Sequence, residues 1–330
     1  MGFGLTRYGI AMHEGNDPTE SSTSSEAAHV RRFATGRQFE LRRGEELAVI
    51  AELGASLRLY SKNGVQLTET YADDEIPPGA SGVTLAPWAN RVDGGVWLLN
   101  GKKQQLDITE VSRNNASHGL LRNAGYSLVE ESEHSVTLEA TVFPQHGYPF
   151  LVRHRVQYAL AAEGGLEVQQ TLINDTPDPA PVVLGSHPYL RLGDVDPSTV
   201  TLTVPGATRL VADERLIPRS SESVSGDFDL RAGKVVGELD IDVAITDLEF
   251  TNGRAVSTLA DPAGRTVSLW QDETCQYVHI YVTNGFPGRT FAVAVEPMTG
   301  PANAFNSGEG LNWVAAGAQF SMTWGIQAQL

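Results

Sequence analysis

The sequence predicts an all-β protein, a large antiparallel β-sandwich with few helices. Short segments alternate apolar and polar residues, most clearly in residues 135–143, so that every second side chain would point to one face of a sheet. Turn-forming clusters separate these segments, for example at residues 163–165 and 261–264. Helical periodicity is almost absent. Many antiparallel strands around one continuous core are typical of a single sandwich.

The chain divides by composition into a short lead-in and one domain. Residues 1–35 are rich in small polar side chains and lack apolar periodicity, so we predict a disordered N-terminal segment. Residues 36–330 show no break in composition, and residues 213–231 are predicted to form a loop. The expected strands are residues 46–53, 55–61, 65–71, 135–143, 152–160, 166–173, 201–204, 256–259, 266–270, 277–282, 291–295 and 320–326.

Composition and charge narrow the class of function. The 330 residues are 41 % hydrophobic, ample for a large core. With 24 Lys and Arg against 40 Asp and Glu, the net charge is −16, and no basic run indicates a nucleic-acid or membrane partner. No apolar stretch has the length of a membrane helix, and no secretion signal is apparent. Cys275 is the single cysteine, so no intrachain disulfide can form, and a cytoplasmic protein is expected.

A carboxylate follows the apolar run at residues 291–295. Glu296 precedes Pro297, which cannot donate a hydrogen bond to a sheet. We therefore expect the strand to end at Glu296 and to hold this side chain at the edge of the sheet, a good position for a general base. The alternative from spacing alone is an ordinary solvated acid.

Polar loops supply further candidates. Asn90 and Arg91 lie in a Pro/Gly-rich loop, where a guanidinium could bridge sugar hydroxyls or a carboxylate, or simply lie at the surface. His118 precedes a glycine, and His187 precedes a proline that holds it extended. Tyr189 could offer an aromatic face to a pyranose.

The remaining histidines predict no metal centre. His279 lies on the face of a strand with Tyr277 and Tyr281, and is expected to be structural or solvated. The sequence contains no H-x-H or HExxH spacing, so no metal site is expected.

These motifs occur in the order found in one enzyme family. From about residue 38 to the C-terminus the chain resembles the aldose 1-epimerase (galactose mutarotase) family, and it carries that family's motifs in Asn90-Arg91, His118-Gly119, Gly185 to Tyr189, Asp242, Glu296 to Thr299 and Phe305-Asn306. The resemblance implies a galactose mutarotase-like supersandwich with a sugar cleft across one concave sheet.

The resemblance also implies roles for individual residues. His187 matches the family's general acid and Glu296 its general base, while Arg91, His118 and Asp242 match positions that bind the sugar. Asp240 and Asp247 are close competitors for the position given to Asp242. Asn90 and Tyr189 complete the expected substrate-binding set. The reaction needs no cofactor, the partner is a monosaccharide, and a monomer or homodimer is expected.

The substrate is the least determined expectation. Leu120 after His118-Gly119, and then Arg122, partly resemble the hexose-6-phosphate epimerase branch. We nevertheless predict a free hexose such as galactose or glucose, because Arg91 and Arg122 would have to hold a phosphate dianion against a net charge of −16. The remaining alternatives are a hexose-6-phosphate 1-epimerase, a non-catalytic carbohydrate-binding protein, and a glycoside hydrolase or lyase, for which hydrolysis would need a second carboxylate.

Overall fold

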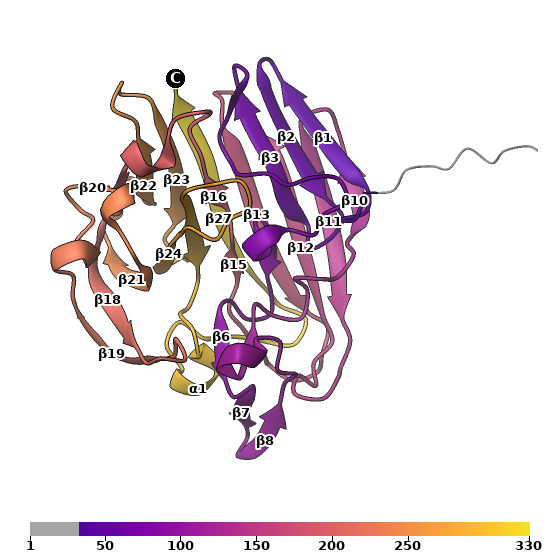
Figure 1. The fold of residues 1–330 in the computed structure, drawn as a ribbon. Helices are drawn as coiled ribbons and strands as arrows, with labels where there is room; N and C mark the ends of the chain where they lie inside the picture. The colour runs from indigo at the N-terminus through magenta and orange to yellow at the C-terminus, as the bar shows by residue number, and fades with distance from the viewer. Residues whose placement is uncertain (1–32) are drawn as a thin grey trace, which may run out of the picture. The chain divides into compact units, whose positions relative to one another are not determined.

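The computed structural model describes residues 33–330 (Figure 1). Most of the predicted N-terminal segment, residues 1–32, therefore lies outside the described residues. The last residues of that segment belong to the domain. The amide of Ala34 donates to the carbonyl of Asp73 at 2.8 Å, and the carbonyl of Thr35 accepts from Leu53 at 3.0 Å.

The largest sheet has nine strands, and its order confirms the predicted antiparallel architecture. Its middle strands pair in register over their full length, with Val152 opposite Asn174 and Leu160 opposite Leu166. From one edge to the other it contains β10 (Ser127–Glu131), β11 (Ser135–Val142), β12 (Val152–Leu160), β13 (Leu166–Asn174), β27 (Gln319–Gln329), β23 (Thr266–Asp272), β22 (Arg254–Ala260), β17 (Thr201–Thr203) and β20 (Lys234–Val235).

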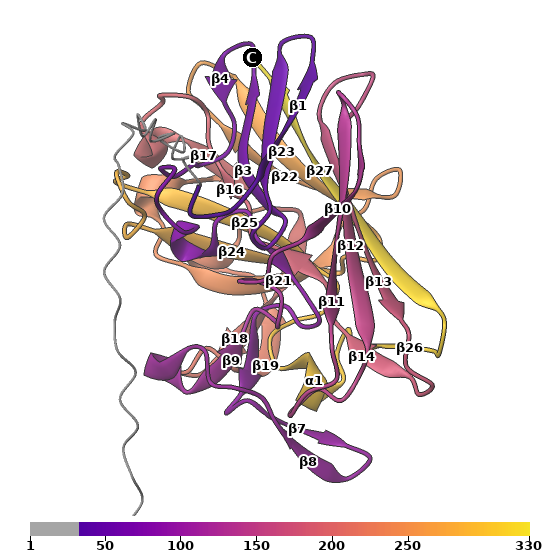
Figure 2. The ribbon, with the colours of Figure 1, turned by 90° about the vertical axis from the view of Figure 1, so that its right-hand side faces the viewer.

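A second sheet of eight strands carries most of the residues of interest. Figure 2 shows its strands β21, β24 and β25 on one side of the domain and β12, β13 and β27 on the other. Its order is β19 (Pro218–Ser223), β18 (Gly206–Ala212), β21 (Asp242–Leu248), β24 (Tyr277–Thr283), β25 (Ala292–Met298), β15 (Gly185–Ser186) and β5 (Thr84–Leu85), with β16 (Tyr189–Leu190) also paired to β25.

Smaller sheets and turns complete the domain. The four-stranded sheet contains β1 (Gln38–Arg43), β2 (Glu46–Ala51), β3 (Ser56–Lys62) and β4 (Val65–Gln66), and the three two-stranded sheets are β14 (Ala180–Val182) with β26 (Asn312–Val314), β6 (Arg91–Asp93) with β9 (Asn115–Ser117), and β7 (Val96–Leu99) with β8 (Lys102–Gln105). Helical structure in the described residues is limited to α1 (Ala304–Ser307) and the 3-10 turns η1 (Pro78–Ala80), η2 (Val111–Arg113), η3 (Pro197–Thr199), η4 (Gly226–Phe228) and η5 (Val236–Glu238).

One core joins the two large sheets. Its buried side chains include Val156 and Trp324 from the nine-stranded sheet and Ile280 and Val295 from the eight-stranded sheet. The alternation that predicted the strands therefore places one apolar face of each sheet in a shared interior.

Three local predictions were wrong. Residues 213–231 contain β19, an edge strand without a buried residue, so no apolar alternation could indicate it. In residues 65–71 only β4, two residues long, is a strand. The strand at residues 291–295 does not end at Glu296, because Met298 still pairs with Tyr277 on one side and Gly185 on the other. Glu296 is therefore not at a strand end, and it is buried rather than solvated.

Candidate active site

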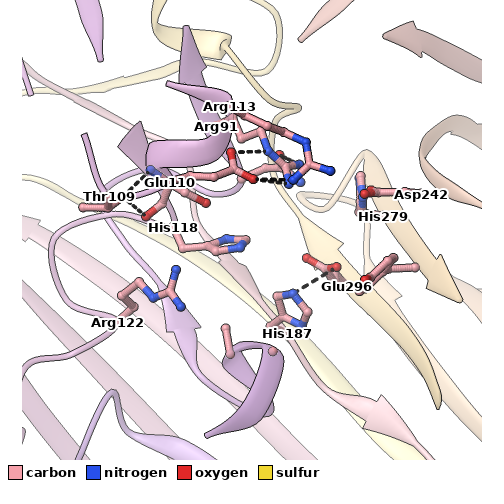
Figure 3. A pocket seen from close by; sticks show the side chains of 15 residues that line it. Arg91, Thr109, Glu110, Arg113, His118, Arg122, His187, Asp242, His279 and Glu296 are labelled. Atoms are coloured by element: carbon pink, nitrogen blue, oxygen red, sulfur yellow. Dashed lines mark hydrogen bonds and ion pairs between the residues drawn. The ribbon is translucent and has the colours of Figure 1, made fainter. Parts of the chain in front are cut away.

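Four side chains form a row across the eight-stranded sheet. His279 on β24 lies directly opposite Glu296 on β25. On the other side of β25, Gly185 pairs with Met298 and Tyr189 with Ala294, which brings His187 level with Glu296. Asp242 on β21 is opposite Tyr281 in the ladder and reaches His279 diagonally, so carboxylates and imidazoles alternate: Asp242, His279, Glu296, His187 (Figure 3).

The centre of the row is a buried contact between an imidazole and a carboxylate. His187 Nε2 lies 3.3 Å from Glu296 Oε1, and the two side chains are only 6 % and 2 % exposed. His187 Nδ1 and Glu296 Oε2 have no hydrogen-bond partner within residues 33–330. Burial raises the pKa of Glu296 to about 7, and burial with the neighbouring charges of His279 and Arg122 lowers the pKa of His187 to about 3.

The other end of the row is a short ion pair. His279 Nε2 lies 2.6 Å from Asp242 Oδ1. Burial alone would lower the pKa of His279, but the hydrogen bond to Asp242 and the charge of Glu296 outweigh it and raise that pKa. Burial likewise opposes the ionised form of Asp242, yet the hydrogen bond from His279 lowers the pKa of this carboxyl. Both shifts favour the ionised form of the pair, an imidazolium beside a carboxylate.

A buried chain of hydrogen bonds supports β15 beside His187. Tyr126 Oη lies 2.7 Å from His154 Nδ1, and His154 Nε2 lies 3.1 Å from Gln170 Oε1. Gln170 then donates to Ser186 Oγ at 2.7 Å, next to His187 in the chain. Strands β12 and β13 of the nine-stranded sheet thus hold Ser186, and with it the backbone next to His187, through satisfied polar contacts that restrict its motion.

A second wall of the cleft is built from residues 90–122. Arg91 makes a bidentate ion pair with Glu110, with Nε at 2.8 Å and Nη2 at 3.0 Å. Arg91 also donates to Asn90 Oδ1, and Glu110 accepts from Arg113 and Asn115. Burial opposes the charge on Glu110, but its contacts with Arg91 hold the pKa of this carboxyl below its usual range. The planar guanidinium is therefore fixed in one orientation.

His118 reaches the cleft because Gly119 allows a close approach of two loops. At Gly119, with φ +74°, an added Cβ would lie 2.1 Å from the carbonyl oxygen of Ala86, which explains the glycine at this position. The amide of His118 donates to Asn90 O at 2.7 Å, and its ring packs edge-on against His187 at 5.3 Å. Burial and the neighbouring cations hold the pKa of His118 well below its usual value, so it is a neutral imidazole.

Arg122 differs from the other arginines of the cleft. Arg91 and Arg113 are both paired with Glu110. Arg122 forms no hydrogen bond or ion pair with the part of the chain that the structure describes, and its Nε is buried. Its guanidinium points into the cleft towards His187 and His118 (Figure 3). Arg122 therefore belongs to the cleft.

The cleft is large enough for a monosaccharide. Its volume is about 270 Å³, near the lower end of small-molecule sites, which begin at roughly 300 Å³. The lining is mainly polar, as a sugar with several hydroxyls requires. The side chains and loop residues that line it are Gly79, Ala80, Asn90, Arg91, Thr109, Glu110, Arg113, Ser117, His118, Arg122, His187, Asp242, His279, Tyr281 and Glu296.

Six of the seven predicted site residues line this cleft: Asn90, Arg91, His118, His187, Asp242 and Glu296. Tyr189 does not. It is 1 % exposed and stacks on His187 at 5.2 Å, where it supports that ring. Among the competing aspartates, Asp242 occupies the cleft, Asp240 lines a separate hollow, and Asp247 is exposed and accepts from Thr208.

Sequence reasoning missed two residues. His279 was expected to be structural or solvated, yet it lines the cleft beside Tyr281. The alternation that put His279 and Tyr281 on one face of the strand was the available signal. No local signal indicated Glu110, because its partner Arg91 lies 19 residues away in the chain, at the start of β6.

Other motifs of the sequence have packing roles. Phe305 contacts Trp88 and Trp97 edge-on, and Asn306 donates to Val96 O at 2.8 Å. The further arginines that could have converged on the cleft are paired elsewhere, Arg153 and Arg155 with Glu139, and Arg289 with Glu69. Within residues 33–330 there is no cluster of three metal-ligating side chains and no helix long and apolar enough to cross a membrane.

Comparison with known proteins points to one family. The family model for aldose 1-epimerase matches residues 37–327. The uncharacterized protein YihR of Escherichia coli (strain K12) is 31 % identical over 297 residues, which cover 89 % of this chain and 94 % of YihR. A probable aldose 1-epimerase of Arthroderma benhamiae is 24 % identical over 180 residues, 48 % of this chain and 40 % of its own.

Solved structures share the fold at low identity. A galactose mutarotase-like protein from Clostridium acetobutylicum superposes with a TM-score of 0.78 at 18 % identity, covering 88 % of this chain and 94 % of its own. The galactose 1-epimerase from Lactobacillus acidophilus superposes with a TM-score of 0.73 at 19 % identity, covering 88 % and 93 %.

Proposed function

Because the chain belongs to the aldose 1-epimerase family, we propose that it interconverts the α and β anomers of a free hexose such as galactose or glucose. The observation that carries this proposal is the buried contact between His187 and Glu296 at the floor of a polar cleft. One acid and one base, within reach of one sugar, are what opening a cyclic hemiacetal requires.

The proposed reaction opens and recloses the sugar ring. The Glu296 carboxylate takes the proton of the C1 hydroxyl, and the His187 imidazolium gives its proton to the ring oxygen. The bond between C1 and the ring oxygen breaks, and C1 becomes an aldehyde. After rotation about C1–C2 the ring oxygen attacks the other face of C1, its proton returns to His187, and Glu296 returns its proton to the new C1 hydroxyl. The steps balance without a cofactor.

The second wall would bind and orient the sugar. Arg91, fixed by Glu110, presents guanidinium donors to the sugar. Asp242 would accept hydrogen bonds from sugar hydroxyls while it also binds His279. His118 has a buried Nδ1 without a partner within residues 33–330, which a sugar hydroxyl could satisfy. Asn90 completes this part of the binding site.

The pKa directions predict the pH range of activity. Between about pH 3 and about pH 7, the pKa values of His187 and Glu296, the pair holds one proton. Above about pH 7 this last proton is lost, and neither residue can protonate the ring oxygen. We therefore expect the rate to fall as the pH rises through about 7, and to fall again in strong acid when both groups are protonated.

Polarimetry on freshly dissolved α-glucose and α-galactose tests the proposal. A mutarotase speeds the relaxation of optical rotation and leaves the amount of sugar unchanged. A carbohydrate-binding protein would bind the sugar without changing the relaxation rate, and a hydrolase or lyase would act on a glycoside and release a product. No acceleration for any aldose would overturn the proposed function.

Arg122 favours a second candidate, a hexose with an anionic group at C6 such as a hexose 6-phosphate. An unpaired guanidinium that points into a cleft is a natural partner for an oxyanion. It is also the only arginine of the cleft without a carboxylate partner in residues 33–330. One free positive charge fits a monoanion better than a dianion, because a dianion would leave a charge uncompensated in an acidic protein.

A substrate panel separates the two candidates. We would measure kcat/KM for glucose, glucuronate, glucose 6-sulfate and glucose 6-phosphate, with the wild type and with Arg122→Gln. If an anion binds at Arg122, the variant loses about 10²-fold on the anionic sugars, the size expected for a charged hydrogen bond. Glucose turnover should be kept or increased, since removal of this cation lets His187 hold a proton more easily. A wild-type preference for glucose over every anionic sugar would leave the free hexose as the substrate.

The partner, the oligomeric state and the cellular location of the protein stay predictions. We expect a monosaccharide as the partner, a monomer or homodimer, and a cytoplasmic location.

A further inference from the structure

The alternating row across the sheet contains one group that the proposed acid–base chemistry does not use. His279 lies on β24 between Asp242 on β21 and Glu296 on β25. Its Nε2 is bound by Asp242 at 2.6 Å, while its Nδ1 is buried without a partner in residues 33–330. A buried imidazole held by one carboxylate and facing another needs a physical explanation.

The spacing of the row places the charge of His279 closer to one member of the catalytic pair. Directly opposite residues in an antiparallel ladder have Cβ atoms about 4.5–5.5 Å apart, which is the relation of His279 to Glu296. His187 lies on the far side of β25, one strand further away, and strands are about 4.8 Å apart. A positive charge on His279 therefore stabilises the Glu296 carboxylate more than it destabilises an imidazolium at His187.

The His187–Glu296 pair needs an electrostatic influence that favours the proton on His187. Burial favours the neutral form of both groups, so in the empty cleft the shared proton rests on Glu296 and leaves His187 neutral. Ring opening needs the reverse, a carboxylate at Glu296 and an imidazolium at His187. The charges of His279 and Arg122 both lower the pKa of His187 and oppose this transfer, so His279 assists it only through its position directly opposite Glu296.

The other charged groups around Glu296 are already engaged. Arg91 also favours the carboxylate form of Glu296, but its guanidinium is bound bidentately by Glu110. Asp242 opposes that form, and its charge is largely offset by His279 and by Arg91. His279 is thus the cation directly opposite the carboxylate in the ladder.

We propose that His279 is a positioning residue for the reaction: kept positively charged by Asp242, it draws negative charge onto Glu296 and thereby moves the shared proton to His187. This inference rests on the proposed function, since it assigns the proton arrangement of the same pair. His279 keeps its own proton throughout, so no additional transfer enters the reaction. Asp242 gains a second role besides sugar binding, because it sets the charge state of His279.

The pH dependence of kcat in His279→Gln tests the proposal. The amide fills a similar space without a charge. At pH values where the pair holds one proton, kcat for α-glucose or α-galactose should fall about tenfold, as the proton returns to Glu296. Without the cation the pair binds its last proton more tightly, so the alkaline fall in rate should move up by about one pH unit. Asp242→Asn should move the alkaline limb in the same direction but by less, because His279 is no longer held charged while the loss of the Asp242 charge itself favours the Glu296 carboxylate.

The control is His146→Gln, which removes an exposed imidazole paired with the exposed Asp107. It should change neither kcat nor the position of the alkaline limb. If His279→Gln lost kcat while the alkaline fall in rate stayed at the same pH, the proposal would be overturned, and His279 would have only a structural role. An unchanged kcat would overturn it as well.

A spectroscopic readout separates this inference from the proposed function. In full-length protein with nitrogen-15-labelled histidine, both ring nitrogens of His279 should be protonated at pH 7.5 in the wild type, and one in Asp242→Asn. A wild type that does not accelerate mutarotation would refute the proposed function, while the charge state of His279 would still be decided by NMR. A neutral His279 in the wild type would refute the inference whatever the activity.

Discussion

The two walls of the cleft handle charge in opposite ways. On the wall built from residues 90–122, Arg91 and Arg113 share the Glu110 carboxylate as their ion-pair partner, and Arg122 alone is left without one within the described residues. On the wall built from strands β21, β24 and β25, Asp242, His279 and Glu296 stand in a row whose charges depend on the position of protons. The first wall carries fixed charges, and the second carries groups that titrate.

This difference follows from where each wall lies in the fold. An arginine stays charged at any relevant pH, so a loop can present it once an ion pair fixes its orientation. The Glu296 carboxyl needs burial to raise its pKa to about 7, near the working range, and the interior of a sheet provides that burial. We therefore expect substitutions on the loop wall to change KM, and substitutions on the strand wall to change kcat and its pH dependence.

Glu296→Gln should have the largest effect and would confirm the strand wall as the site of proton transfer. A general base contributes about 10²–10⁴-fold, so the mutarotation rate should fall by this factor with KM changed only a few-fold. Polarimetry measures the rate, and circular dichroism checks the fold. Retention of more than about a tenth of the wild-type rate would remove Glu296 from the role of base.

His187→Gln should cost about as much as Glu296→Gln, and the double variant little more than either. The two residues share one proton, and groups that act as a unit are strongly non-additive. Polarimetric kcat for the two single variants and the double variant gives the comparison. If the two losses simply multiplied, His187 and Glu296 would act independently and the pair would not be the catalytic unit.

Gly119→Ala tests whether backbone geometry builds the loop wall. The new Cβ would meet Ala86 O at 2.1 Å with φ at +74°, so we expect a loss of about 1–3 kcal/mol in the free energy of unfolding. Urea denaturation measures it. Gly44→Ala is the matched control, since it has a positive φ but nothing within 4 Å of the added Cβ. Equal losses in both variants would mean that strain at φ, and not the contact between the loops, determines the cost.

Glu110→Gln should have the smallest effect and would sharpen the division between the walls. Arg91 loses its charged bidentate partner but stays in the cleft, so KM for the sugar should rise about tenfold, the lower end of the range for a charged hydrogen bond. The alkaline limb of the rate should stay in place, because Glu110 is not part of the row. Arg113→Gln, which leaves the Arg91–Glu110 contact intact, is the control. A shift in the pH profile of Glu110→Gln would show that the walls are coupled.

The outcome for the histidines shows how far sequence reasoning reaches. His118 and His187 were found because each stands beside a glycine or proline in a polar loop, a local signal. His279 lies in a regular strand, where alternation gives its face but not what that face borders. Tyr189 was placed on the correct segment but with the wrong function, because its ring lies beneath His187 rather than in the cleft.

The sequence alone determined the class of fold, the long strands β11, β12 and β13, and the types of residue available for acid–base chemistry. These properties follow from periodicity and turn chemistry, which act between residues close in the chain. Only the tertiary structure decided that His279 belongs to the row, that Glu110 fixes Arg91, and that Arg122 has no partner within residues 33–330. Each of these three properties depends on which distant strands and loops become neighbours in the fold. Burial depends on the same long-range packing, and burial shifts the pKa values of Glu296 and His187.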